Sequence, residues 1–275
     1  MKTVIVATDF STTATNAVNY AVDMALAIKA GILLFHVYQI PVIYSELPVA
    51  FSEEDTRHDI KKNLIDLKLH IIQKTGGKLN IETEVRLGSF FPELKTLCEN
   101  IMPYTVVMGS QGTTFTERLL FGSHTVYAMK YLMWPIITVP PNASFSAVKK
   151  IGIACDLSKA ITTMPIDEIN ILVKDFDAEL HILNIDKWQV HNPSTDCESI
   201  LLQQMMRHLK PTYHFITDKN TDEAILDFVD KNSIDLLIVL PRRRGLLRRL
   251  IHRSHTKQLI LYSHVPVMAL HFEIL

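Results

Sequence analysis

Cysteine is scarce in this chain, and no stretch is apolar enough for a membrane span. The three cysteines are Cys98, Cys155 and Cys197. Their spacing fits no zinc motif, and their odd number argues against a disulfide framework, so we expect each to serve as a small apolar residue. The longest apolar runs, such as 234–240, fall far short of the ~20 residues that a bilayer-spanning helix requires.

A surplus of charge of one sign is also missing. The formal net charge is -1, which gives no general argument for binding to nucleic acid or to a membrane surface. The opening residues MKTVIVATDF form a strand pattern without a signal-peptide cleavage region, and we expect a cytoplasmic protein. The twelve histidines include no HExxH and no close metal-ligand set. Since no nucleophile–base pair can be assigned either, we name no catalytic residue and no metal ligand.

The two halves of the sequence repeat one pattern. Residues 2–11 read KTVIVATDFS and residues 149–158 read KKIGIACDLS, each with a basic residue, an apolar strand, an Asp, an apolar residue and a Ser. Further matches join 32–37 to 180–185, 104–108 to 235–240, 135–139 to 266–270, and 123–125 to 254–256. We predict two homologous domains, 1–141 and 148–275, joined by a Pro/Ser-rich linker at 140–146.

Within each half, apolar strands alternate with segments of helical period, a pattern typical of a parallel α/β sheet. The strands predicted in the first half are Thr3 to Thr8, Ile32 to Val37, Ile81 to Leu87, Thr105 to Met108 and Ile136 to Val139. The predicted helices are Thr13 to Lys29, Ser52 to Gly76, Phe91 to Asn100, and one that precedes the fifth strand. The second half should repeat this plan, with its second helix at Glu198 to Leu209.

A glycine motif follows the apolar run 104–108. Gly109, Gly112, Gly122 and Ser123 are spaced as G-x2-G-x9-GS. Glycines let a backbone approach a ligand closely, and the free N–H groups of such a loop, with the start of the next helix, can bind phosphate. The alternative is an ordinary flexible loop, but the order of the three glycines and the hydroxyl after a strand favours nucleotide phosphate.

Asp9 ends the first strand. Ligands of open parallel sheets bind beyond the carboxyl ends of the strands, where the chain order reverses. If the first and fourth strands are neighbours, Asp9 faces the glycine loop, where it could accept hydrogen bonds from a ribose or adenine or help to hold a phosphate-bound cation. The alternative is that Asp9 caps the first helix together with Ser11.

The glycine motif, the strand that ends in Asp9, and the pair His36-Val37 resemble the ATP-binding pattern of the universal stress protein family. The resemblance covers nearly the whole chain as two tandem domains. It implies the fold class α/β, with two tandem Rossmann-like domains, each a five-stranded parallel sheet with helices on both faces. It also implies that the domains pair through their last strands, Ile136 to Val139 against Val267 to Leu270.

The same resemblance implies a nucleotide site in the first domain. Adenine would lie near Asp9 and Val37, and the phosphates would lie along the glycine motif. The implied nucleotide-binding residues are Ala7, Thr8, Asp9, Val37, Met108, Gly109, Gly112, Gly122, Ser123 and His124. The implied cofactor is ATP, with or without Mg2+, and the implied role is stress-linked nucleotide binding.

The second half departs from the motif. Aligned on Ser254, the position of Gly122 holds Arg253, and Pro241 and Arg244 stand in place of the other two glycines after a one-residue gap. Proline has no N–H to donate, and arginine side chains would fill the phosphate space. We therefore expect no ATP site in this half and interpret its Asp156 as a helix cap.

Arginine is concentrated in that same segment, with no acidic residue among the arginines. One interpretation is an anion site for a phosphate-bearing ligand or an acidic protein partner, and the alternative is a solvated basic loop. No aromatic residue interleaves the segment, so nucleic acid is not favoured. The candidate anion-binding residues are Arg242, Arg243, Arg244, Arg248, Arg249 and Arg253.

Three hypotheses follow from these patterns. The first, which we favour, is a stress-response protein that binds ATP or a related adenine nucleotide in its first domain and uses the second for domain pairing or partner binding. A homodimer of such chains is a further option. The second is a slow ATPase or self-phosphorylating protein, with Ser123, Thr113 or Thr114 as the phosphate acceptor. The third is a nucleotide-free interaction scaffold.

Overall fold

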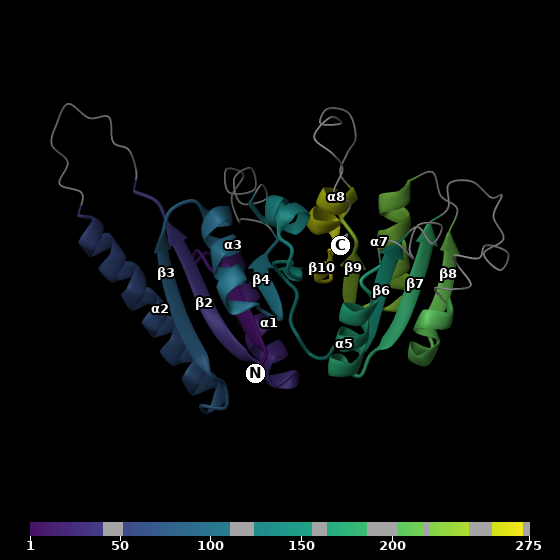
Figure 1. Ribbon diagram of the computed structural model, residues 1–275, viewed down its shortest axis with the longest axis horizontal. Helices are drawn as coiled ribbons and strands as arrows, with labels where there is room; N and C mark the ends of the chain where they lie inside the picture. Colours follow the sequence, from purple (N-terminus) through teal and green to yellow (C-terminus); the bar gives the residue numbers. More distant parts are fainter. Residues whose placement is uncertain are drawn as a thin grey trace.

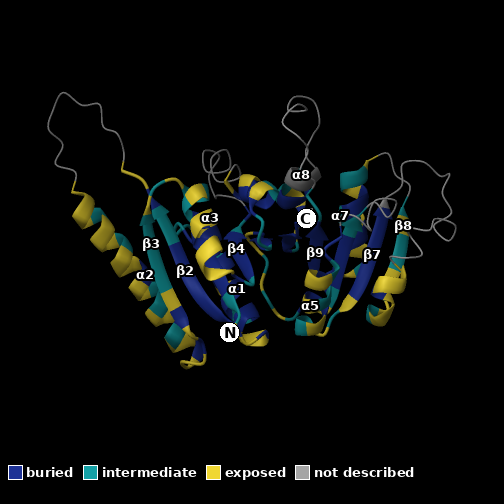
Figure 2. Cartoon of the chain, in the orientation of Figure 1, coloured by how far each residue is buried: buried dark blue, intermediate teal, exposed yellow. Residues whose placement is uncertain are grey.

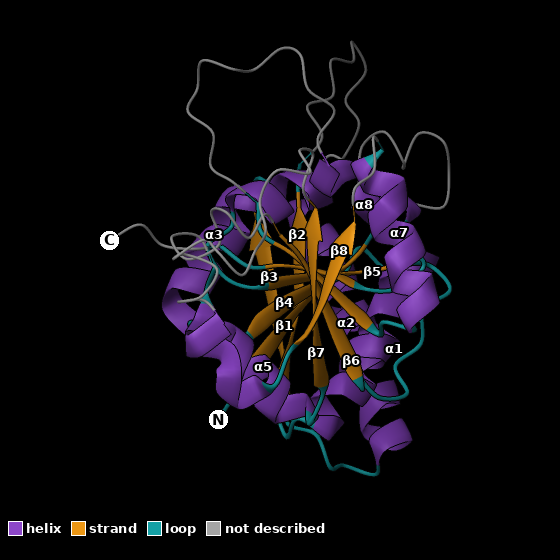
Figure 3. Cartoon of the chain, turned by 90° about the vertical axis from the view of Figure 1, so that its right-hand side faces the viewer, coloured by secondary structure: helices purple, strands orange, loops and turns teal. Residues whose placement is uncertain are grey.

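Ten strands form one continuous sheet in the computed structural model. The structure describes residues 1–40, 52–110, 124–155, 164–185, 203–216, 220–241 and 255–271. The strands follow the order β3-β2-β1-β4-β5-β10-β9-β6-β7-β8. Helices cover both faces of this sheet, as the views in Figure 1 and Figure 3 show.

The first half builds one five-stranded part of the sheet. Its parallel strands are β1 (Thr3–Ala7), β2 (Gly31–Tyr38), β3 (Ile81–Leu87), β4 (Thr105–Gly109) and β5 (Ile136–Val139). Its helices are α1 (Thr12–Ala27), α2 (Glu53–Thr75), α3 (Phe90–Ile101) and the helical residues 124–131. The bounds predicted from the sequence differ from these by no more than two residues.

The second half repeats this plan. Its parallel strands are β6 (Lys150–Cys155), β7 (Glu179–Ile185), β8 (Thr212–Ile216), β9 (Leu236–Val239) and β10 (Val267–Ala269). Its helices include α5 (Ile166–Phe176), α7 (Thr221–Asn232) and α8 (His255–Tyr262). Of the helix predicted at Glu198 to Leu209, the described part is helical at 203–206 and continues as a 3-10 turn, η2 (Arg207–Leu209).

The ends of α2 show how local sequence signals set these bounds. Ser52 Oγ accepts a hydrogen bond from the Asp55 main-chain N–H at 3.1 Å, and acidic residues fill the first turn, where the helix dipole favours negative charge. Gly76 ends the helix at φ 61°, a left-handed conformation that glycine adopts without strain. Neither α2 nor any other described helix is long and apolar enough to cross a bilayer.

The two half-sheets join through their last strands. β10 pairs with β5 in antiparallel register, with Met268 opposite Ile137, and Thr138 Oγ1 donates a hydrogen bond to the Val267 carbonyl at 3.2 Å. This confirms the strand pairing that the family resemblance implied. The tandem domains therefore share a single sheet.

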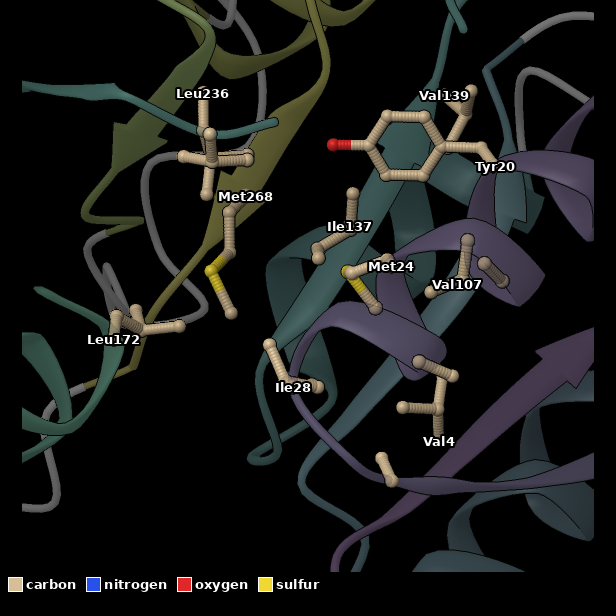
Figure 4. Packing of buried hydrophobic residues seen from close by; sticks show 14 of the residues in the cluster. Val4, Tyr20, Met24, Ile28, Val107, Ile137, Val139, Leu172, Leu236 and Met268 are labelled. Carbon is tan, nitrogen blue, oxygen red and sulfur yellow. The ribbon is translucent and has the colours of Figure 1, made fainter. Parts of the chain in front are cut away.

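Both faces of the sheet carry a hydrophobic cluster that extends across this junction. One cluster includes Met24 of α1, Ile137 of β5, Leu172 of α5 and Met268 of β10, and Figure 4 shows these side chains. The other cluster lies under α3, residues 124–131, α7 and α8. The inner strands are accordingly buried, the outermost strands β3 and β8 are largely half-buried or exposed, and the outer faces of the helices are exposed (Figure 2).

The segment predicted as a linker is docked against α1. Asn16 Nδ2 donates hydrogen bonds to the carbonyls of Pro140 and Ala143 at 2.9 and 3.0 Å. The Phe145 ring meets Tyr20 edge to face, with 5.3 Å between ring centroids. Because α1 also supplies Met24 to the shared cluster, this helix contacts both the linker and the junction of the halves.

Two histidines form a hydrogen-bonded pair in the second half. His181 on β7 is 7% exposed, and its Nδ1 lies 3.1 Å from Nε2 of His214 on β8. Phe228 of α7 packs edge to face on the His214 ring at 4.9 Å. Burial, and secondly the neighbouring His181, lower the pKa of His214, so that the folded state favours its neutral form.

We predict that acidification destabilises the protein through His214. The pKa of His214 is lower in the folded state than in the unfolded state, where it is about 6.5. The neutral His214 side chain therefore contributes fully to the free energy of unfolding above pH 6.5, and this contribution is lost as the pH falls through the folded-state pKa. Denaturant unfolding at about pH 7.5 and about pH 5 should show a smaller loss of stability for His214→Gln than for the wild type. His208→Gln, at an exposed histidine, should keep the wild-type pH dependence. Equal losses in wild type and His214→Gln would contradict the prediction.

Candidate functional site

A cavity of about 300 Å³ opens at the carboxyl ends of β1, β2 and β4. In the order β3-β2-β1-β4-β5, the chain runs outward from β1 to β3 on one side and from β4 to β5 on the other. The boundary between β1 and β4 is therefore the point of strand-order reversal, where open parallel sheets bind ligands. The lining residues are Ala7, Thr8, Asp9, Ser11, Thr13, Ala14, Val37, Gln39, Phe90, Met108, Gly109, His124 and Thr125.

The structure brings most of the sequence-predicted site residues together here. Seven of the ten line the cavity, namely Ala7, Thr8, Asp9, Val37, Met108, Gly109 and His124. The other three, Gly112, Gly122 and Ser123, lie outside the described residues.

Sequence reasoning missed part of the lining. The start of α1 contributes three of the missed residues, the cap Ser11 and the first-turn residues Thr13 and Ala14. Because they follow Asp9 closely in the sequence, their nearness to the site could have been predicted. Thr125 follows the repeated Ser-His pair, so its place in the site could also have been predicted from the sequence. Phe90 comes from α3 and had no local signal, because only the packing of α3 on the sheet brings it to the cavity.

The turn between β1 and α1 is held by local hydrogen bonds. Asp9 Oδ1 accepts a hydrogen bond from the Ser11 N–H at 3.0 Å, and Ser11 Oγ accepts one from the Ala14 N–H at 3.2 Å. Ser11, rather than Asp9, is thus the cap of α1. Among the described residues, Asp9 accepts this bond through Oδ1, and its side chain lines the cavity.

His36 supports this turn from the neighbouring strand. Its Nδ1 lies 2.8 Å from the Thr8 carbonyl, which can only accept, so Nδ1 carries the proton. The Phe10 ring stacks on the imidazole at 5.0 Å. Burial lowers the pKa of His36, and this effect is opposed by the bond to Thr8 and by the charge of Asp9. The imidazole is therefore neutral at pH 7.

Gly109 allows two chain segments to meet at the cavity. A Cβ atom added at Gly109 would lie 2.8 Å from Thr13 Cγ2 and 3.2 Å from the Thr13 carbonyl oxygen. Thr125 Oγ1 donates a hydrogen bond to the Gly109 carbonyl at 3.2 Å. This glycine is thus needed for the close packing of α1 and residues 124–131 around the end of β4, whatever it contributes toward a phosphate.

The described lining is mainly apolar and carries little charge. Asp9 is the one lining residue with a formal charge in the described part of the chain. The His124 ring meets Phe90 edge to face at 5.8 Å. No cluster of three or more His, Cys, Asp or Glu side chains that could hold a metal occurs among the described residues. These side chains can contact a ligand, orient it and exclude water from it.

The register of the second half corrects one prediction. Val4 pairs with Thr105 and its repeat partner Ile151 pairs with Leu236, so counting along the strands places Leu240 at the position of Gly109. The prediction that Pro241 takes this place after a gap is wrong. The ungapped alignment instead sets Arg243 against Gly112. Leu240 packs against the first hydrophobic cluster, and Asp156 and the six arginines lie outside the described residues.

Comparisons with known proteins agree with this architecture. The sequence matches the model of the universal stress protein family over residues 1–140 and 148–271. A solved universal stress protein from Archaeoglobus fulgidus shares 17% identity over 98% of both chains, with a TM-score of 0.73. A putative universal stress protein from Pseudomonas aeruginosa shares 8% identity over 98% of this chain and 93% of that chain, with a TM-score of 0.59. No curated protein matches the sequence. At these identities the solved structures show a common fold.

We predict that Gly109→Ala destabilises the protein. The added methyl group would press on Thr13, and overpacking of this kind costs about 1–3 kcal/mol of unfolding free energy. Ser110→Ala is the matched control: Ser110 is 1% exposed and its hydroxyl has no partner in the described part of the chain, so its removal should leave stability equal or higher. Urea unfolding gives the stability of both variants relative to the wild type. A Gly109→Ala protein as stable as the wild type would refute the close approach of Gly109 to Thr13.

Proposed function

The chain belongs to the universal stress protein family, and from this premise we propose that its first half binds ATP or a related adenine nucleotide in the cavity between β1, β2 and β4. The observation that supports the proposal most strongly is the position of the cavity at the strand-order reversal, with Asp9, Val37 and Gly109 on its wall. We further propose that the protein acts as a cytoplasmic stress-response protein.

The chemistry of the lining fits such a ligand. Small-molecule sites commonly begin at about 300 Å³ and combine apolar walls with a few polar groups. Ala7, Val37 and Met108 offer an apolar wall for a purine, and Asp9 offers an acceptor for a ribose hydroxyl. Gly109 opens the motif that would bind the phosphates. Asp9 is also the lining carboxylate that could ligate a Mg2+ ion carried by those phosphates.

The second half supports a different role. Its last strand pairs with β5, and Leu240 occupies the position that Gly109 holds in the first half. We propose that this half serves the pairing of the domains and the binding of a partner. The proposed anion-binding role of the arginine-rich segment, with an acidic protein as partner, stays a prediction because the segment lies outside the described residues.

We predict that Val37→Arg abolishes nucleotide binding without unfolding the protein. The longer, charged side chain would enter the apolar wall of the cavity from the end of β2. Calorimetric titration of the wild type with ATP should give about one nucleotide per chain, and ATP at 100 times its Kd should raise the free energy of unfolding by about 2.7 kcal/mol.

Leu87→Arg provides the matched control for this experiment. It places the same side chain at the end of the adjacent strand β3, where Leu87 is 42% exposed and does not line the cavity. This variant should bind ATP as the wild type does. Wild-type affinity in Val37→Arg would show that the site is elsewhere, and a wild type that binds no adenine nucleotide would favour the interaction scaffold.

A further inference from the structure

We propose that His36 is a positioning residue for Asp9, holding the turn between β1 and α1 in the conformation that presents the Asp9 carboxylate to the nucleotide. His36 is not among the residues that line the cavity, so its effect on the ligand is transmitted through the turn. The inference rests on the proposed function and adds to it the residue that fixes the ligand-facing carboxylate.

The His36 ring contacts the residues on both sides of Asp9. Its Nδ1–H donates to the Thr8 carbonyl at 2.8 Å, immediately before Asp9. Its face stacks on the ring of Phe10, immediately after Asp9, with 5.0 Å between centroids and 29° between planes. A single side chain from β2 therefore fixes the backbone on one side of the carboxylate and a side chain on the other.

The turn needs this support because its backbone is strained. Phe10 has φ 65°, in the left-handed region that bulky residues rarely adopt. Such conformations persist where the surrounding structure enforces them, and they concentrate at ligand sites. Two bonds within the turn help, from the Phe10 N–H to Thr8 Oγ1 at 3.1 Å and from the Ser11 N–H to Asp9 Oδ1 at 3.0 Å. The contacts with His36 join the turn to the neighbouring strand.

The second half supplies a natural comparison. Ala7 pairs with Phe35 and its repeat partner Ala154 pairs with Leu183, so Asn184 stands at the position of His36. The sequence there keeps Asp156 but has Leu157 where the first half has Phe10. The strands of both halves pair alike, so the fold does not require the two rings. The rings occur in the half that also carries the glycine motif, as a role in ligand binding would predict.

Two substitutions of His36 in the full chain separate its contacts. His36→Phe keeps a ring against Phe10 and removes the N–H donor, and His36→Asn keeps an N–H donor and removes the ring. Loss of one hydrogen bond corresponds to an affinity change of at most about 10-fold, so His36→Phe should weaken ATP binding by up to that factor while His36→Asn recovers part of the loss. His58→Phe, at an exposed histidine of α2, should bind ATP as the wild type does.

A double-mutant cycle with Asp9→Asn tests the route of the effect. If His36 acts through Asp9, His36→Phe should add little to the loss of ATP affinity that Asp9→Asn already causes. Additive losses, or a His36→Phe variant that melts at a lower temperature but binds ATP with unchanged affinity, would overturn the inference and leave the proposed function standing. A wild-type protein that binds no ATP would overturn both.

Discussion

The antiparallel pairing of β5 with β10 is the contact on which the arrangement of the two halves depends. Both strands are short, and each forms the inner edge of its own parallel half-sheet. An unpaired edge would expose a row of main-chain hydrogen-bonding groups, and the pairing removes two such edges at once. It also places Ile137 beside Met268, so that the hydrophobic clusters pass from one half to the other. The tandem chain is therefore one sheet with one core layer on each face.

The two halves keep the same strand pairing while their potential sites differ. Leu240 packs against the hydrophobic cluster at the position where Gly109 leaves room for Thr13, and Asn184 stands where His36 supports the β1–α1 turn. Packing of the strands tolerates these differences because strand pairing depends on main-chain groups and apolar burial. A ligand cavity depends on individual side chains and on close backbone approach. A common fold therefore does not by itself give both halves the same site.

Most of the fold could be predicted from the sequence because its signals are local. Strand hydrophobicity and the caps Ser52 and Gly76 set element bounds closely, and the repeated pattern predicted two similar halves. The family resemblance added the β5–β10 pairing. Strand-end geometry pointed to Asp9 and Gly109, because the carboxyl ends of parallel strands meet at one edge of a sheet. The family resemblance added the other five lining residues that were named, Ala7, Thr8, Val37, Met108 and His124.

The missed features depend on distant contacts. The closeness of Gly109 to Thr13 and the docking of the linker on Asn16 involve residues far apart in sequence, which no local pattern records. The alignment of Pro241 with Gly109 used a one-residue gap, whereas the strand register requires none. Amide hydrogen exchange of the full chain, measured with and without ATP, tests whether the nucleotide binds in the first half. We expect ATP-dependent protection at the ends of β1, β2 and β4, and protection confined to the ends of β6 and β9, or none, would contradict binding in this cavity.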